Sequence, residues 1–318
     1  MDCAIGLDVG GTVMKAALTA ADGTVLHTDR RPTPRDDGPD AVVAALVGYA
    51  ADLACAATDR QLTPRALGVA VPGIIDEPGG IAAFSANIGW RDVPLRKLLA
   101  DCTGLPTAVG HDVRTGGIAE ARLGAGRGSS QFFFLPIGTG IAGAIVLGGR
   151  AHTGAHGGAG EIGHTVVRPG GDPCPCGSAG CLETLASGVS IARRYAERYG
   201  DGLSPGLTAA EIAGRVASGD GAASEVWAEA VDALADALAQ VTVLLDPGLV
   251  VIGGGVGDAG ETLLAPLRAA LASRLTFSQP PRLVRAELGD AAGALGAALL
   301  GWDLVGSTES ADSDGSQS

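Results

Sequence analysis

The sequence predicts an α/β protein of two related lobes, each of which opens with a β-hairpin. An apolar strand, a turn containing Gly and Thr, and a second apolar strand occur at residues 4–18 and again at residues 131–147. Helical segments and further apolar strands follow each hairpin, which is typical of α/β folds. At 318 residues the chain is long enough for two hydrophobic cores, one in each lobe.

Apolar runs that end at turn-forming residues define the elements of the first lobe. The run from Ala4 to Val9 ends at two glycines, and the run from Arg65 to Val71 ends at Pro72-Gly73, so both are expected to be strands. The composition of residues 39–58 favours a helix. We expect strands at residues 4–9, 13–18, 24–28 and 65–71, and helices at residues 39–58 and 112–123.

The second lobe repeats this beginning and adds longer helices. The apolar run from Leu249 to Ile252 leads into three glycines, and Asp246-Pro247 ends the helix that precedes it. We expect strands at residues 131–137, 141–147, 249–252 and 282–287, and helices at residues 222–245, 260–274 and 291–300.

The order of these elements sets the expected division of the chain. We assign residues 1–112 and 289–304 to the first lobe and residues 113–288 to the second. Ser, Asp, Gly and Glu dominate residues 305–318, so we expect this tail to be disordered.

Composition excludes several classes of function. The net charge of −13 argues against a nucleic-acid surface, which requires a basic face. No uninterrupted apolar run approaches the roughly 20 residues that cross a bilayer. The N-terminal residues lack the basic and apolar stretches of a signal peptide. We therefore expect a cytoplasmic protein that binds neither membrane nor nucleic acid.

The first hairpin carries residues suited to phosphate binding. Gly10 and Gly11 allow backbone N–H groups to approach phosphate oxygens, because no Cβ stands in the way. Thr12 adds a hydroxyl donor, Lys15 a cation, and Asp8 a carboxylate that could hold a hydrated Mg²⁺ ion. The alternative is an ordinary hairpin with a buried Asp at the end of its strand.

The second hairpin contains a run that matches a dinucleotide-binding fingerprint. Gly138-Thr139-Gly140-Ile141-Ala142-Gly143 has the G-x-G-x-x-G spacing, but that fingerprint requires a helix to follow. A strand and another glycine turn follow instead, which argues against a dehydrogenase and favours a second phosphate-facing hairpin. Gly254 and Gly255 would allow a similar close approach to a ligand, although a plain loop is the alternative.

One carboxylate is placed to act as a general base. Asp112 follows His111 at the start of a predicted short helix. Sugar hydroxyls are poor nucleophiles at neutral pH, and a carboxylate that accepts their proton is the usual remedy in phosphoryl transfer. Asp112 could also simply cap the helix, and one side chain can do both.

Three cysteines and one histidine predict a structural zinc site. Cys174, Cys176 and Cys181 lie within eight residues of one another, and His164 precedes them. Three thiolates and an imidazole form a common four-coordinate zinc ligand set. Glu161 and Glu183 flank these ligands and are left free, so the metal could fix both carboxylates toward a polyol. The isolated Cys3, Cys55 and Cys102 are expected to be small buried residues.

Together these motifs resemble the ROK family (repressors, open reading frames and sugar kinases). The resemblance extends from Ile5 to about Gly301. Its most specific parts are the D-x-G-G-T-x-x-K start, the E-x-G-H segment and the C-x-C-G-x-x-G-C-x-E segment. It implies the actin-like, hexokinase-like ATPase fold, with two lobes and a cleft between them. It also implies ATP-dependent phosphorylation of a hexose, most simply of glucose, by a homodimer or homotetramer.

The resemblance implies a role for each motif. The ATP phosphates would lie between Gly10–Thr12 and Gly138–Gly140, with Mg²⁺ bound and with Gly254 and Gly255 near the adenosine. Asp112 matches the catalytic base. The family's zinc ligands correspond to His164, Cys174, Cys176 and Cys181. The sugar contacts correspond to Gly73, Asn87, His111, Asp112, Glu161, His164 and Glu183.

One departure bears on the substrate. Members of the family usually carry Asn-Asp where this chain has His111-Asp112, and that Asn helps to recognise a sugar hydroxyl. Histidine can also donate or accept a hydrogen bond, but its shape differs. N-acetylmannosamine, N-acetylglucosamine, fructose and allose therefore stay open as substrates beside glucose, and polyphosphate stays open as donor.

Two other functions use the same fold. A ROK repressor carries a winged-helix segment before the first hairpin, whereas this hairpin begins within the first dozen residues and Asp112 is retained. A sugar-binding protein with weak catalysis is the second alternative, and a measurement of ATP turnover would distinguish it from a kinase.

Overall fold

The computed structural model describes residues 1–199 and 206–315. The chain forms two compact units. The first unit contains residues 1–123, residues 153–158 and the chain from Asp290 onward; the second contains residues 124–152 and 159–289.

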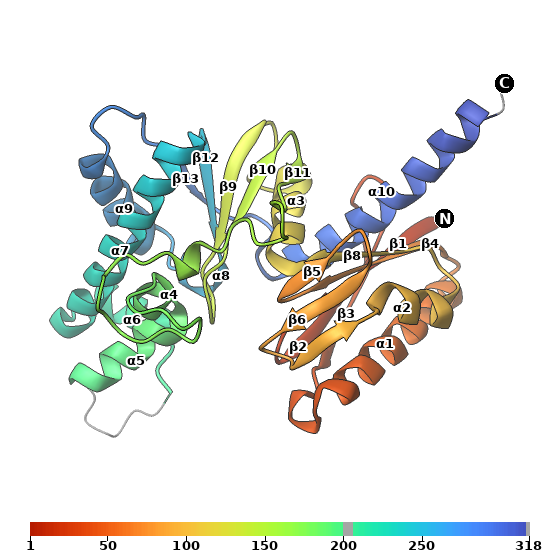
Figure 1. The fold of residues 1–318 in the computed structure, drawn as a ribbon, viewed down its shortest axis with the longest axis horizontal. Helices are drawn as coiled ribbons and strands as arrows, with labels where there is room; N and C mark the ends of the chain where they lie inside the picture. Colours follow the sequence, from red (N-terminus) through yellow and green to blue (C-terminus); the bar gives the residue numbers. More distant parts are fainter. Residues whose placement is uncertain (200–205, 316–318) are drawn as a thin grey trace. The chain divides into compact units, whose positions relative to one another are not determined.

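A five-stranded mixed sheet forms the centre of the first unit (Figure 1). The three strands at the N-terminus form an antiparallel meander, and two later strands join it parallel to β1. Residues 3–7 of β1 are fully buried, as expected for a strand that is covered on both faces. In the order β3-β2-β1-β4-β8, the strands are β3 (Val25–Pro32), β2 (Val13–Thr19), β1 (Asp2–Val9), β4 (Thr63–Val71) and β8 (Thr107–His111).

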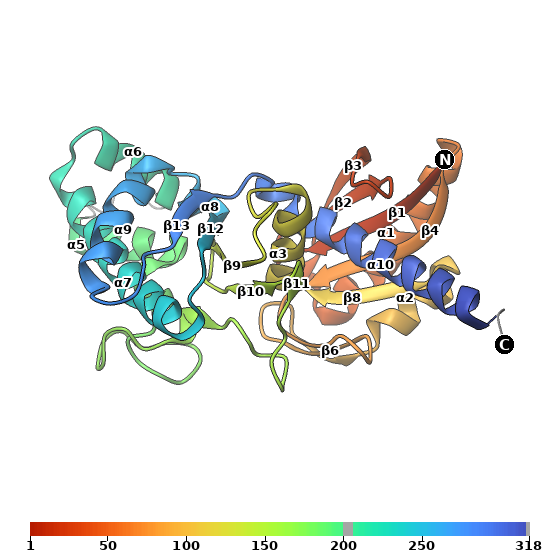
Figure 2. The same cartoon turned by 90° about the horizontal axis from the view of Figure 1, so that it is seen from above.

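Alternate residues of β1 and β4 face different helices. Ile5 and Leu67 belong to a core that includes α1 (Pro39–Asp59) and α2 (Leu95–Thr103). The intervening Gly6 and Gly68 face α10 (Ala292–Gly315), where an added Cβ would lie 2.0 Å and 1.7 Å from backbone oxygens of that helix. Since successive side chains of a strand point to opposite faces, α10 and α1 cover opposite faces of the sheet. Figure 2 shows α10 lying along the strands.

Helix α1 is the one described helix long and apolar enough to cross a membrane. Its apolar side chains, among them Leu46 and Tyr49, are buried in the core of the first unit. It thus packs as the core helix of a folded unit does.

The second unit contains a sheet of the same design. Its first three strands are antiparallel neighbours, and its last two are parallel to β9. In the order β11-β10-β9-β12-β13, they are β11 (Arg150–Ala151), β10 (Ala144–Leu147), β9 (Gln131–Pro136), β12 (Leu249–Gly253) and β13 (Arg282–Arg285). The duplication predicted from the two hairpins is therefore confirmed, although β10 begins three residues later than the predicted strand.

Helices pack around the second sheet, and α7 is the longest of those within its core. The predicted helices at 222–245 and 260–274 correspond to α7 and α9. The helices of this unit are α4 (Glu183–Ala186), α5 (Gly188–Tyr199), α6 (Ala209–Ala217), α7 (Gly221–Leu245), α8 (Gly254–Gly257) and α9 (Glu261–Arg274). Short 3₁₀ turns occur at η1 (Arg35–Asp37), η2 (Ile162–His164) and η3 (Gly289–Ala291).

The segment between β4 and β8 contains elements that the sequence analysis did not predict. A small antiparallel sheet has the order β5-β6-β7, with β5 (Ile74–Asp76), β6 (Ile81–Ser85) and β7 (Trp90–Val93). Helix α2 and strand β8 follow it. These strands are short and carry little apolar alternation, so the sequence offers a weak signal for them.

Two expected boundaries differ from the structure. The first unit extends to Leu123, beyond the expected boundary at 112, because α3 (Asp112–Leu123) packs against α10. Helix α10 also continues to Gly315, whereas we expected disorder from residue 305. The helix continues past the buried Ala297 and Ala298 because no Pro, which would end it, follows in this part of the sequence. The last three residues of the expected tail, 316–318, lie outside the described residues.

Candidate active site and metal centre

The turn between β1 and β2 presents an open glycine face. Gly10 N–H donates to the carbonyl of Val13 at 3.0 Å, and the Thr33 hydroxyl donates to the carbonyl of Gly10 at 2.7 Å. A Cβ at Gly11 would meet only the Arg35 guanidinium, at 4.0 Å. Thr12 is exposed. The turn is therefore held by its own hydrogen bonds and leaves room at Gly11 for a ligand.

Asp8 lies beside the beginning of α10. A Cβ at Gly293 would lie 2.5 Å from the Asp8 carboxylate, so the absence of a side chain there makes room for it. Lys15 pairs with Asp8 in the β1–β2 register, and its ammonium lies 3.2 Å from Asp290. Asp290 and Gly293 were not predicted from the sequence, where their only signal is the Gly-Asp-Ala-Ala-Gly run before the small-residue helix.

The electrostatics of Asp8 connect it to the predicted base. Burial, followed by the negative charge of Asp112, raises the pKa of Asp8 from 3.8 to about 7; Lys15 opposes this shift, and Asp290 adds to it. Two carboxylates that repel one another favour the binding of a cation or a proton between them. The structure thus brings Asp8, Lys15 and Asp112, predicted from separate motifs, into one electrostatic site.

This pKa shift predicts a pH-dependent effect of Asp8→Asn on stability. The unfolded carboxyl ionises near 3.8 and the folded one only near 7, so the free energy of unfolding falls as the pH rises through this window. The amide of Asn does not ionise, so the variant does not lose this part of the free energy of unfolding. We expect Asp8→Asn to raise the free energy of unfolding by as much as about 4 kcal/mol above pH ~7.5 and to change it little below pH ~4.

Denaturant unfolding of metal-free protein at both pH values measures this effect. Asp22→Asn is the control, because Asp22 is an exposed turn residue of the same unit whose carboxylate accepts from Thr24 N–H at 2.9 Å. A stability gain of Asp8→Asn that is equal at both pH values would contradict the raised pKa.

Asp112 begins α3 directly after β8. Its Oδ1 accepts from Val113 N–H at 2.8 Å and lies 3.3 Å from Nδ1 of His111. The side chain of Asp112 is 33% exposed, whereas that of His111 is only 7% exposed. Asp112 thus lies at the first position of the helix and presents a carboxylate that solvent or substrate can reach.

The remaining predicted sugar contacts of the first unit lie in and around the small sheet. Gly73 has φ +114°, and a Cβ there would lie 2.1 Å from the carbonyl of Phe84. Glycine is thus required where the chain passes β6. Asn87 is exposed in the turn between β6 and β7. Their contacts with a sugar stay a prediction.

Two glycine segments of the second unit lie together. The carbonyl of Ile137 accepts from Val256 N–H at 3.0 Å, and Gly138 N–H donates to Gly140 at 3.0 Å. Gly254 has φ +74° and approaches Ile137 so closely that a Cβ would lie 2.4 Å from its carbonyl oxygen. The exposed Thr139 and Gly255 therefore belong to one surface, which was predicted from two motifs about 115 residues apart.

The sequence suggested that the Glu183 carboxylate would be free, but in the structure it has a hydrogen-bond partner. Its Oε2 accepts from Ile141 N–H at 2.8 Å, directly after the second hairpin turn. A Cβ at Gly140 would lie 2.6 Å from the same oxygen. Glu161 is exposed beside η2. One predicted sugar contact is therefore anchored to the glycine hairpin, and the other faces solvent.

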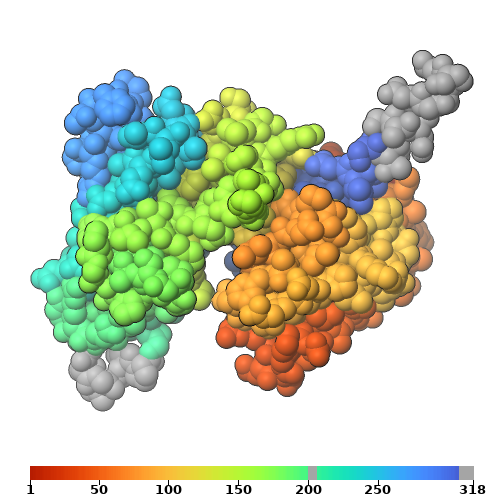
Figure 3. Space-filling view, viewed as in Figure 1, coloured from red at the N-terminus to blue at the C-terminus, as the bar shows by residue number. Residues whose placement is uncertain are grey.

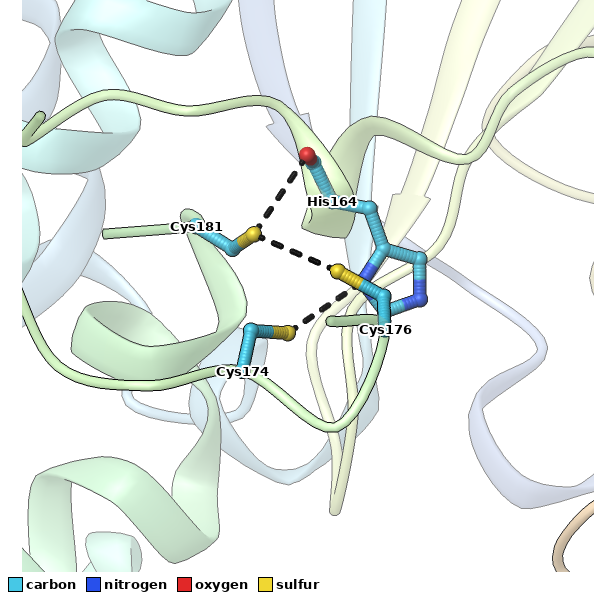
Figure 4. A group of neighbouring side chains, drawn as sticks. All are labelled: His164, Cys174, Cys176 and Cys181. Carbon is cyan, nitrogen blue, oxygen red and sulfur yellow. Dashed lines mark hydrogen bonds between the residues drawn. The ribbon is translucent and has the colours of Figure 1, made fainter. Parts of the chain in front are cut away.

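The four predicted zinc ligands lie within 4.8 Å of one another (Figure 4). Nδ1 of His164 is 3.6 Å from Sγ of Cys174, and Sγ of Cys176 is 3.7 Å from Sγ of Cys181. Tetrahedral zinc with bonds of about 2.3 Å to sulfur and about 2.1 Å to nitrogen separates its ligand atoms by roughly 3.6–3.8 Å. The donor set and its spacing therefore fit one zinc ion.

Backbone contacts shape the loop that carries these ligands. Cys174 N–H donates to Ser178 at 2.8 Å, and Gly177 N–H donates to Cys174 at 2.9 Å, which closes a tight knuckle. Gly180 lies so close to the carbonyl of Arg168 that a Cβ would be 1.6 Å away. The loop lies on the surface of the second unit, in green in Figure 3.

The other cysteines take no part in this cluster. Cys3 is buried, as predicted, but Cys55 and Cys102 are exposed. That prediction was wrong for Cys55 and Cys102, which are not among the residues that α1 and α2 bury in the core.

Comparison with known proteins identifies the family. The profile of the ROK family matches residues 4–303. A glucokinase of Thermotoga maritima is 34% identical over 315 residues, or 95% of this chain and 98% of that protein. An N-acetylmannosamine kinase of Escherichia fergusonii is 34% identical over 297 residues, or 93% of this chain and 97% of that protein.

Solved structures agree with this match. A ROK family glucokinase from Streptomyces griseus, determined in complex with glucose and AMPPNP, has a TM-score of 0.81 and 31% identity, and the similarity covers 95% of this chain and 99% of that one. With the duplicated sheets and the Cys/His cluster, these similarities show that the chain belongs to the ROK family and has its actin-like ATPase fold.

Proposed function

We propose that this protein is an ATP-dependent hexose kinase and that glucose, converted to glucose 6-phosphate, is its leading substrate. The observation that carries the proposal is the accessible carboxylate of Asp112 at the start of α3, close enough for its charge to raise the pKa of the partly buried Asp8. A base beside a second, cation-binding carboxylate is the arrangement that phosphoryl transfer to a hydroxyl requires.

In the proposed reaction Asp112 accepts the proton of the sugar hydroxyl as that oxygen bonds to the terminal phosphorus of ATP and ADP leaves. Mg²⁺, held through Asp8, would neutralise phosphate charge. The N–H groups of the two glycine turns would bind phosphate oxygens, since both turns leave open space at a glycine. The zinc ion has no direct part in this chemistry and would fix the segment that carries Glu183.

The nucleotide assignment predicts that Gly138→Val raises the Michaelis constant for ATP. No atom lies within 4 Å of a Cβ built at Gly138, so the branched side chain should fit the folded protein and still block a phosphate. Gly140 is a poorer test, because its Cβ would collide with Glu183. We expect a rise of about tenfold or more in the Michaelis constant, the scale of one lost charge-assisted hydrogen bond.

Steady-state kinetics at saturating sugar measure this change. Gly248→Val is the matched control, since a Cβ at Gly248 also meets no atom but lies before β12, away from the turns. An unchanged constant in Gly138→Val would remove the second hairpin from the nucleotide site.

The identity of the sugar needs a direct assay. The glucokinase and the N-acetylmannosamine kinase named above are both 34% identical to this chain, and His111 replaces the Asn usual in the family. Coupled ADP release should be measured with glucose, N-acetylmannosamine, N-acetylglucosamine, fructose and allose, and with polyphosphate in place of ATP. The largest kcat/KM is expected for glucose with ATP. ADP release from none of these sugars would refute the proposed activity and favour a sugar sensor.

A further inference from the structure

A buried arginine lies two residues after Asp112. Arg114 is 2% exposed, although arginine is almost never fully buried without a partner. Its Nε donates to Oε1 of Glu77 at 2.9 Å, and its Nη1 donates to the carbonyl of Gly157 at 2.8 Å. Glu77 follows β5, and Gly157 belongs to residues 153–158, which pack in the first unit. One guanidinium thus connects α3 to two segments far away in the sequence.

The same residues contact the turn that carries Asp112. Oε1 of Glu77 accepts from the backbone N–H of His111 at 3.4 Å, and the backbone N–H of Arg114 lies 3.5 Å from Nδ1 of His111. That Nδ1 in turn lies 3.3 Å from Oδ1 of Asp112. Glu77 therefore contacts this turn at two points, one on each side of Asp112.

We propose that Arg114 and Glu77 are positioning residues for Asp112: their ion pair fixes the β8–α3 turn so that the carboxylate meets the sugar hydroxyl in a reactive geometry. The inference rests on the kinase function proposed above. A forked guanidinium suits this role because it can bind a carboxylate and a carbonyl at once, which a lysine ammonium on a flexible stem does less rigidly. Neither residue needs to touch the substrate.

The test must separate positioning from simple stabilisation. Removing one partner of a buried pair leaves an uncompensated charge and can prevent folding, whereas replacing both with uncharged residues of similar size is often tolerated. Glu77→Gln/Arg114→Met therefore removes the pair without burying a lone charge. Lys97→Met/Asp101→Asn makes the same chemical change in an exposed ion pair on α2 and is the matched control.

We expect the Glu77→Gln/Arg114→Met variant to fold and to lose about tenfold to a hundredfold in kcat, the scale of a misplaced catalytic group. Its Michaelis constant for ATP should change by less than about twofold, because the variant keeps the contacts that bind ATP equally in the ground state and in the transition state. Arg114→Lys should lose kcat in the same direction. A wild-type kcat in either folded variant, or a kcat loss equalled by the α2 control, would overturn the proposal.

A second measurement keeps this inference separate from the proposed activity. Hydrogen exchange of the backbone amides at residues 111–116 reports the order of the turn without any substrate. Faster exchange there in the double variant, with unchanged exchange in α1, supports positioning even if no hexose in the panel is phosphorylated. Unchanged exchange in residues 111–116 would overturn it even in an active kinase.

Discussion

Asp112→Asn is expected to lower kcat by about 10²–10⁴-fold, the usual scale of a lost general base, while sugar affinity is retained. The amide has nearly the shape of the carboxylate, and its oxygen can still accept the hydrogen bond from Val113 N–H at the start of α3. It cannot accept the proton of the sugar hydroxyl. The variant should therefore bind and fold normally but turn over slowly. Coupled ADP release gives kcat, and titration calorimetry gives the sugar dissociation constant.

A helix cap elsewhere supplies the control for this prediction. Asp220 caps α7 in the second unit, where its carboxylate accepts from Ala223 N–H at 3.1 Å. Asp220→Asn makes the same change at a cap with no assigned chemistry, so its kcat should match the wild type. Turnover of Asp112→Asn within a few-fold of wild type would show that Asp112 serves the helix and not the reaction.

The duplicated architecture could be predicted because its signal is local. Each sheet begins with consecutive strands joined by glycine turns, so neighbours in the sequence are neighbours in the sheet. The positions of β8 and β5–β7 could not be predicted in the same way. Their short runs pair with strands or turns whose identity the sequence leaves open, and β8 joins β4 only after about 35 intervening residues.

The candidate site shows the same division between local and distant signals. The zinc ligands and the first hairpin have fixed spacings that identify them without a structure. Asp290 and Gly293 lie some 280 residues from Asp8, and Glu77 lies 37 residues from Arg114. Only the folded chain shows that these residues surround the two carboxylates. The anchoring of Glu183 to Ile141 likewise follows from tertiary packing.

Purified protein is expected to contain about one zinc ion per chain, the stoichiometry of a single four-ligand site. Cys176→Ala removes one ligand from a set whose atoms lie at tetrahedral separations. Without the ion, the backbone hydrogen bonds of the loop, such as that from Leu182 N–H to the carbonyl of Thr165 at 2.9 Å, would remain, but the side chains of His164 and Cys174 would lose their link through the metal. Elemental analysis measures the metal, and thermal unfolding measures the expected loss of stability.

The same variant is expected to weaken sugar binding by about tenfold or more, the scale for groups that support a site indirectly, while affinity for ATP alone changes little. Loss of the metal would affect Glu183 through the zinc ligand Cys181. Glu183 follows Cys181 by two residues, and the Thr184 hydroxyl donates to the carbonyl of Cys181 at 2.7 Å. Loss of the metal would therefore act first on the segment that carries Glu183, and would reach the second glycine turn only through the bond from Ile141 N–H to this carboxylate. Cys102→Ala, at an exposed cysteine outside the cluster, is the control and should change neither affinity. Active enzyme without metal would refute the site. A Cys176→Ala protein that lost ATP binding but kept sugar binding would show that the metal supports the nucleotide hairpin, to which Glu183 is bonded, and not the sugar contacts.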